Sequence, residues 1–251
     1  WVLALSPQSR AVIYSALAAF PENLLQHEPF RLHKDVAAEW FEDTDLSPDI
    51  VALAKRMLYV REPSVLFSDS DIVLPRIAAT SDRVRFLKTL SRKSTLLVQL
   101  LVDARSDSEA LARYWGRGRR SKDVEPLIQS LVRHPGGGAL DIMHLLPPFP
   151  RSLIYTYPLP SDRPEVTAHD CHWTALNFFN EQPDERFNDI AFVKRTLLEN
   201  YSPADNRPPE LGDVIVFVQD DDVVVHSCVY LAADIVFTKN GSGFAVPWLL
   251  G

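Results

Sequence analysis

Apolar residues recur at helical spacing through most of the first 145 positions. Serine followed by proline, at Ser6-Pro7 and again at Ser47-Pro48, is typical of a helix N-cap and first turn. Apolar faces then follow over 11–20 and 50–57. The same spacing predicts helices over 81–102, with the serines near 91–94 as a break, and over 108–114 and 121–134. Because the strand signal in this half is confined to 65–67, the pattern predicts an all-α N-terminal domain.

Two clusters of breaker residues interrupt this helical pattern. His134 is followed by one proline and three glycines, and residues 146–150 contain three prolines. A domain boundary is therefore expected between these breaks and Leu153. The sequence predicts a helical domain of unknown role over 1–150 and a second domain over 151–251.

The pattern of apolar residues changes after this boundary, from mainly helical spacing to mainly β-branched runs. A helix is predicted from Cys171 to Phe179, after a loop from Ser161 to His169. Three β-branched runs separated by turn residues, at 214–218, 223–231 and 235–239, then predict antiparallel strands. One helix followed by a meander is an α+β arrangement.

Composition and charge narrow the classes of function. The chain has 251 residues, 46% of them hydrophobic, and a formal net charge of −7, which argues against a nucleic-acid or anionic-membrane binder. The basic run from Arg113 to Arg120 is interpreted as a solvated turn. No stretch reaches the roughly 20 apolar residues of a membrane span. The start at Trp1 suggests a trimmed or mature fragment, so periplasmic, secreted and cytoplasmic locations all stay open.

Cys171 and His226 are the residues in the second half that could carry chemistry. A thiol hydrolase needs a cysteine, a histidine that takes its proton, and a polar group that orients the histidine. Cys171 follows a plausible cap, Asp170, at the expected start of a helix, where a thiol pKa is lowered. His226 lies in a β-branched run, where a histidine is ordinarily a satisfied core residue.

The sequence around these two residues resembles the NlpC/P60 family of papain-like cysteine hydrolases. A Gly212-Asp213 pair opens one strand, the next carries His226 and Tyr230, and Asp170-Cys171 lies upstream. The resemblance covers about 100 residues, from 151 to 251. It implies a papain-like domain with Cys171 as nucleophile, His226 as base and Tyr157 near the reacting carbonyl. It also implies a bacterial cysteine peptidase or amidase that acts on peptide stems of peptidoglycan, without metal or cofactor.

The third member of the site depends on the turn between the last two predicted strands. A three-residue loop over 232–234 pairs His226 with Asn240, whereas a two-residue loop pairs it with Lys239. Asn240 is favoured because its carbonyl oxygen accepts a hydrogen bond from an imidazole N–H, which an ammonium group cannot do.

Two other interpretations of the same residues stay open. The nitrogen and sulfur atoms of His169, Cys171, His172, His226 and Cys228 would suffice for a structural zinc site, although their spacing matches no common motif. Alternatively, Cys171 and Cys228 form a disulfide in a non-catalytic binding or scaffold protein with a degenerate hydrolase domain. The sequence leaves the substrate and the oligomeric state open.

Overall fold

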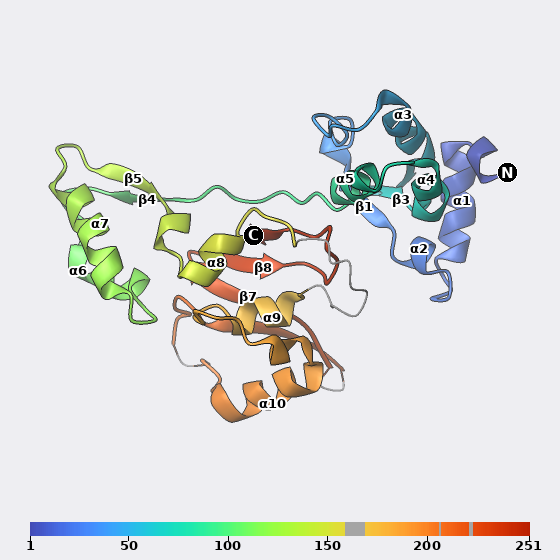
Figure 1. Ribbon diagram of the computed structural model, residues 1–251. Coiled ribbons are helices and arrows are strands. Elements are labelled where there is room, and N and C mark those ends of the chain that lie inside the picture. Colours follow the sequence, from blue (N-terminus) through green and yellow to red (C-terminus); the bar gives the residue numbers. More distant parts are fainter. Residues whose placement is uncertain (159–168, 206, 221–222) are drawn as a thin grey trace. The chain divides into compact units, whose positions relative to one another are not determined.

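The computed structural model describes residues 1–158, 169–205, 207–220 and 223–251. The expected loop from Ser161 to His169 therefore lies, up to residue 168, outside the described residues. The chain forms two compact units, Trp1–Arg92 and Lys93–Gly251 (Figure 1). The boundary expected near residue 150 is wrong, because residues 93–150 share one apolar core with the C-terminal strands. Trp115 and Leu145, for example, belong to the same buried cluster as Val229.

The first unit is mixed rather than all-α. It contains an antiparallel sheet in the order β1-β3-β2, with Val65 paired to Leu32 on one side and to Val60 on the other. Strands of three or four residues are too short to show a clear alternation in sequence. The elements are η1 (Val2–Ala4), α1 (Pro7–Leu17), α2 (Leu24–His27), β1 (Phe30–His33), η2 (Lys34–Val36), α3 (Pro48–Met57), β2 (Tyr59–Arg61), β3 (Ser64–Phe67), α4 (Ser70–Val73), η3 (Leu74–Arg76) and α5 (Thr80–Leu90).

The helix starts of this unit follow the predicted capping. Ser6 accepts a hydrogen bond from the backbone N–H of Ser9 at the start of α1, and Ser47 accepts one from Ile50 at the start of α3. The helices cover a core in which the rings of Phe67 and Phe86 lie 5.7 Å apart. Helix α5 ends at Leu90, so the break expected near 91–94 is confirmed.

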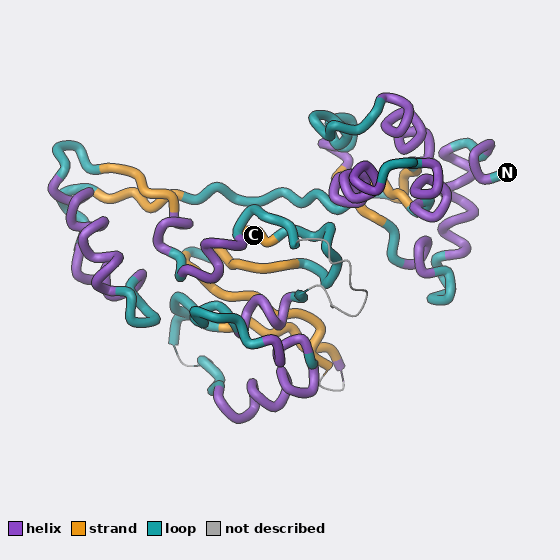
Figure 2. The backbone as a smooth tube through the Cα atoms, viewed as in Figure 1, coloured by secondary structure: helices purple, strands orange, loops and turns teal. Residues whose placement is uncertain are grey.

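The second unit is built around an antiparallel sheet in the order β6-β7-β8-β9 (Figure 2). A separate two-stranded antiparallel sheet, β4 with β5, precedes it, with α6 and α7 between the two strands in the chain. This small sheet was not predicted from the sequence, nor were α10 and β9. The elements are β4 (Gln99–Val102), α6 (Ser108–Trp115), α7 (Ser121–Arg133), β5 (Gly138–Asp141), η4 (Ile142–Leu145), α8 (Pro148–Leu153), α9 (Cys171–Leu176), η5 (Glu185–Asn188), α10 (Ile190–Asn200), β6 (Val214–Gln219), β7 (Val223–Ala232), β8 (Ile235–Lys239) and β9 (Trp248–Leu250). Helix plus antiparallel sheet makes the chain α+β, as predicted.

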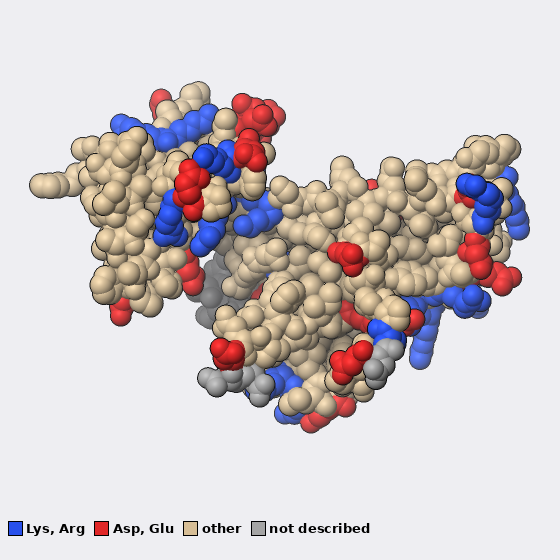
Figure 3. All heavy atoms as spheres, turned by 180° about the vertical axis from the view of Figure 1, so that it is seen from behind, with Lys and Arg blue, Asp and Glu red and all other residues tan. Residues whose placement is uncertain are grey.

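The basic run from Arg113 to Arg120 does form a turn over 116–120, but only part of it is solvated. Arg120 donates to the carbonyl oxygens of Leu145 at 2.8 Å and Trp115 at 2.6 Å, and burial lowers its pKa to about 10. Arg117 forms an ion pair with Glu210. Elsewhere, Lys and Arg side chains are interspersed with Asp and Glu over the face visible in Figure 3. Across the described ranges, we find no helix with the length and apolar character needed to cross a membrane.

Candidate active site

Cys171 is the first residue of α9, as the sequence predicted. Asp170 is the N-cap, and its Oδ1 accepts a hydrogen bond of 2.9 Å from the backbone N–H of Trp173. Its backbone carbonyl accepts from the Thr174 hydroxyl at 2.6 Å. The Cys171 side chain is thereby held at a fixed helix start, with only 7% of the residue exposed.

Helix α9 packs on one face of the sheet. His172 Nδ1 lies 2.8 Å from the Ser227 hydroxyl, Trp248 Nε1 donates to Thr174 Oγ1 at 2.9 Å, and the rings of Phe178 and Phe237 are 6.1 Å apart. The strand register places Ser227, Phe237 and Trp248 on the same face, because Val229 pairs with Phe237 and Lys239 with Trp248.

His226 extends from the other face of β7, since successive side chains of a strand alternate. Its Nε2 lies 3.0 Å from Thr238 Oγ1, and the Thr238 hydroxyl donates to Asn240 Oδ1 at 3.1 Å. A hydroxyl carries one proton, so Thr238 must accept from His226, and Nε2 must be the protonated ring nitrogen. The other nitrogen, Nδ1, therefore keeps its lone pair.

The third member expected from sequence is corrected by this chain of hydrogen bonds. Neither Asn240 nor Lys239 contacts His226 directly; Thr238 does, and Asn240 acts on the ring only through it. The register does extrapolate to His226 opposite Asn240, but β8 ends at Lys239 and the diagonal neighbour Thr238 reaches the ring first. Thr238 was missed because a threonine in a strand ordinarily reflects β-propensity alone.

Lys239 extends to the α9 face, as alternation predicted, and is fully buried there. Its Nζ donates to the carbonyl oxygens of Gly241 at 2.6 Å and Gly243 at 3.0 Å, and lies 5.6 Å from the centre of the Trp248 ring. Burial lowers the Lys239 pKa to about 8, against the opposing effect of the charges of Asp170 and Cys171. These contacts make Lys239 part of the packing around α9.

The electrostatics of the thiol differ from the expectation. Burial raises the pKa of Cys171, and the charge of Asp170 raises it further, although the backbone amides of Ser227, Cys171 and His172 lower it. The depressed pKa expected at a helix start is therefore wrong for this structure, because desolvation exceeds the effect of the amides. Burial also lowers the pKa of His226, so the site holds a neutral thiol and a neutral imidazole at pH 7.

The structure brings the thiol to the strand of His226 without a direct bond between the two. The amide of Ser227, the residue that follows His226, is among the groups that act on the Cys171 sulfur. Among the described residues, no hydrogen bond joins Cys171 and His226. Tyr157 is partly buried and lies two residues before the undescribed segment 159–168, and its role near the reacting carbonyl stays a prediction.

The alternative metal and disulfide sites can be placed on the same geometry. Both cysteines are free thiols, so the expected alternative of a Cys171–Cys228 disulfide is not formed. His169 Nε2 lies 3.0 Å from Glu185 Oε2 and its ring stacks on Trp173, so the histidines have separate partners. Within the described parts of the chain, no three residues of the His, Cys, Asp and Glu types gather as a metal site would require.

Comparison with known proteins yields no relative for this site. No family model matches the chain, and no match is found among curated proteins or among solved structures.

Proposed function

We propose that the second unit is a thiol-dependent amide hydrolase of papain-like arrangement, with Cys171 as nucleophile and His226 as general base. The observation that supports this proposal best is the hydrogen-bond order from His226 Nε2 through Thr238 to Asn240. This order fixes the ring tautomer and leaves Nδ1 as a proton acceptor. A histidine satisfied at both nitrogens would have no such capacity.

Each step of the reaction uses a group already described. The Cys171 sulfur attacks the amide carbonyl carbon while its proton passes to His226 Nδ1. The imidazolium then donates that proton to the leaving nitrogen, which departs as an amine and leaves a thioester on Cys171. Water, deprotonated by His226, hydrolyses the thioester, releases the carboxylic acid and restores the thiol. The Cys171 backbone N–H stabilises the oxyanion, with the Tyr157 hydroxyl in the role implied by the family resemblance.

In the free protein Cys171 and His226 are both neutral, so the thiol must lose its proton during the reaction. Because burial favours the neutral forms of both Cys171 and His226, the proton moves only when a substrate is in place. His226 must then approach the sulfur to within hydrogen-bond distance. Because His226 extends from the face of β7 opposite to the one on which α9 packs, this approach requires a conformational change larger than the usual loosening of an apo site. The resemblance to NlpC/P60 hydrolases points to peptide amides, such as the stem peptides of peptidoglycan, as substrates.

The two buried cysteines provide a matched pair for the test. We expect Cys171→Ala to abolish release of new amino groups from a peptidoglycan digest, and Cys228→Ala to retain it. Mass-spectrometric mapping after brief iodoacetamide treatment should show Cys171 modified before Cys228, whose pKa burial raises to about 11. Activity that survives in Cys171→Ala would contradict the proposal.

A second candidate function is a non-catalytic module with the hydrolase arrangement. It is favoured by the 7% exposure of Cys171 and by the absence, among the described residues, of a hydrogen bond between it and His226. In that case Cys171 and Cys228 should be alkylated equally slowly in the native protein, and neither substitution should affect any amide turnover.

A further inference from the structure

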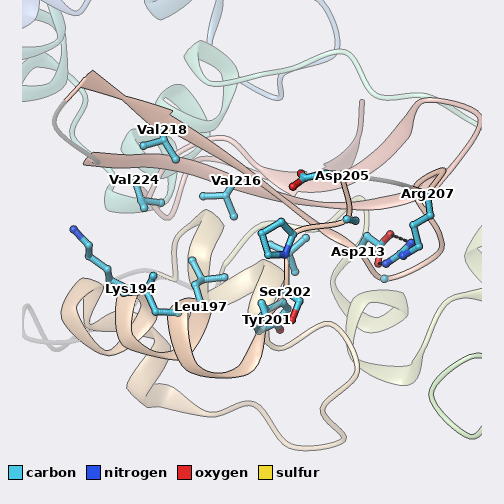
Figure 4. Close-up of a pocket in the computed structure, with 15 residues that line it drawn as sticks. Lys194, Leu197, Tyr201, Ser202, Asp205, Arg207, Asp213, Val216, Val218 and Val224 are labelled. Atoms are coloured by element: carbon cyan, nitrogen blue, oxygen red, sulfur yellow. Dashed lines mark hydrogen bonds and ion pairs between the residues drawn. The ribbon is translucent and has the colours of Figure 1, made fainter.

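A pocket of about 850 Å³ lies between α10, residues 201–205 with Arg207, and β6, separate from the candidate active site. Leu197 and Tyr201 face Val216 across it, as Figure 4 shows. Its volume falls in the range of roughly 300–1,000 Å³ of small-molecule sites. Neither Cys171 nor His226 is among its lining residues.

Alternation along β6 explains why the wall of this pocket is apolar. Val214, Val216 and Val218 lie on one face of the strand, and Val218 pairs with Val224 of β7 beyond a bulge that keeps both in the wall. Leu197 of α10 and Tyr201, the C-cap residue that follows the helix, cover the opposite side. The result is an apolar trough with a helix as its floor.

The two cationic side chains at the pocket, Arg207 and Lys194, differ in whether they form an ion pair. Arg207 is neutralised by a bidentate contact with Asp213, at 2.7 and 2.8 Å. Lys194 is exposed and forms no ion pair with any described residue. In Figure 4 it stands at the end of the trough beside Val224, while Arg207 and Asp213 stand at the other end and Asp205 lies nearer to them. A cation at one end of an apolar trough, with no ion pair to the described residues, complements an amphiphile with an anionic head.

We propose that this pocket binds a medium-chain aliphatic carboxylate, with the carboxylate at Lys194 and the chain between α10 and β6. From Lys194 to Tyr201 the helix rises through seven residues, roughly 10 Å at 1.5 Å per residue. An extended alkyl chain zigzags, so each carbon–carbon bond of about 1.5 Å advances it by roughly 1.3 Å, and that length accommodates about nine carbons.

Isothermal titration calorimetry of the full-length protein with hexanoate, octanoate and decanoate tests how the pocket binds the alkyl part of the ligand. We expect one site per molecule and a Kd that tightens about fourfold per methylene as apolar area is buried. The tightening should level off beyond about nine carbons, where the trough ends. Leu198→Asp, at an exposed position in the pocket wall, should weaken decanoate without unfolding the protein. No saturable binding at millimolar decanoate would overturn the proposal.

Charge variants on α10 test the head group. Lys194→Glu should weaken decanoate at least tenfold and leave decanol unchanged. Arg195→Glu alters the net charge equally but changes a side chain that lies over the Phe192 ring, 5.2 Å from its centre, so it should have no effect. Equal weakening by both variants, or tighter binding of decylammonium than of decanoate, would contradict the assignment of the head to Lys194. A dimer in solution that Leu198→Asp dissociates would show instead that a second copy covers the pocket.

Discussion

In the first unit, three polar side chains hold one another in the core. Arg10 and Asp69 are 0% and 3% exposed, with Arg10 Nε 3.1 Å from Asp69 Oδ2, and the Tyr14 hydroxyl donates to Asp69 Oδ1. Arg10 also donates to the carbonyl oxygens of Val2 at 2.7 Å and Arg56 at 3.2 Å. The two opposite charges of this cluster therefore pair with each other, although Arg10 Nε and Asp69 Oδ2 make no hydrogen bond among the described residues.

In the second unit, the hydrogen-bonded side chains of His226, Thr238 and Asn240 contain no pair of opposite charges. Their hydrogen bonds run in one direction, and the last acceptor, Nδ1 of His226, is left with a lone pair. The first cluster pairs its two charges, although Arg10 Nε and Asp69 Oδ2 form an ion pair without hydrogen-bond geometry, whereas the second has a neutral ring nitrogen available for proton transfer. A polar cluster indicates chemistry when it leaves an atom that can take a proton from a reactant, and it indicates structure when opposite charges hold one another in the core.

The largest expected effect is the loss of the buried Arg10–Asp69 ion pair of the first unit. Asp69→Ala should destabilise the first unit by about 3–5 kcal/mol, because it leaves the Arg10 charge buried without its partner. Hydrogen exchange of α1 amides during urea unfolding measures this loss. The paired change Arg10→Met with Asp69→Leu should recover most of it, since an apolar pair of similar size needs no counter-charge. Full stability of Asp69→Ala alone would show that the cluster contributes little.

Thr238→Val should lower turnover about 100-fold, because the ring loses the acceptor that fixes its tautomer. Valine keeps the shape of threonine, so the unfolding free energy should fall by only about 1 kcal/mol for the lost hydrogen bond. Thr238→Ser retains the hydroxyl and is the matched control. Equal turnover in Thr238→Val and the unchanged protein would remove the distinction between the two clusters.

Asn240→Ala should have a smaller effect on turnover, about tenfold, since Asn240 orients the Thr238 hydroxyl rather than the ring itself. Lys239→Ala should instead act on stability, because the side chain is fully buried and packs on Trp248. Turnover and urea midpoints of the two variants distinguish a catalytic role on the His226 face of the sheet from a packing role on the α9 face. A larger loss of turnover in Lys239→Ala at unchanged stability would place the lysine in the reaction.

The contrast also explains what the sequence could predict. Local signals, such as the Ser6 and Ser47 caps and the β-branched run of β8, predicted elements correctly because neighbouring residues suffice to form them. The short strands of the first unit and the contacts of residues 93–150 depend on partners far along the chain. The position of Cys171 at a helix start could be predicted from neighbouring residues. That Thr238 is the partner of His226 depends on a bulge after Tyr230 and on where β8 ends. The direction of the thiol pKa depended on burial, which no motif specifies.

The smallest expected effect concerns pH and two histidines, the buried His172 and the half-buried His226. Burial lowers the pKa of His226 and of His172 below the value of about 6.5 for an unfolded chain. Below pH 6.5 the unfolded state therefore binds more protons than the folded state, so stability rises with pH in this window and is lost as pH falls through it. The carboxylates whose pKa is lowered, such as Asp213, lose their contribution only below about pH 3.8.

Urea midpoints between pH 7 and pH 5 measure this histidine effect apart from the carboxylates. We expect His226→Gln and His172→Gln each to flatten the decline, and the double variant to remove most of it, because glutamine has no proton to bind in this range. His134→Gln, at an exposed histidine bonded to the Gly137 carbonyl, is the control and should leave the slope unchanged. A decline of full size in the double variant would mean that neither imidazole is held neutral by the fold. The pKa of His226 would then equal that of an unfolded chain, about 6.5, and burial would not be the reason that its ring is neutral at rest.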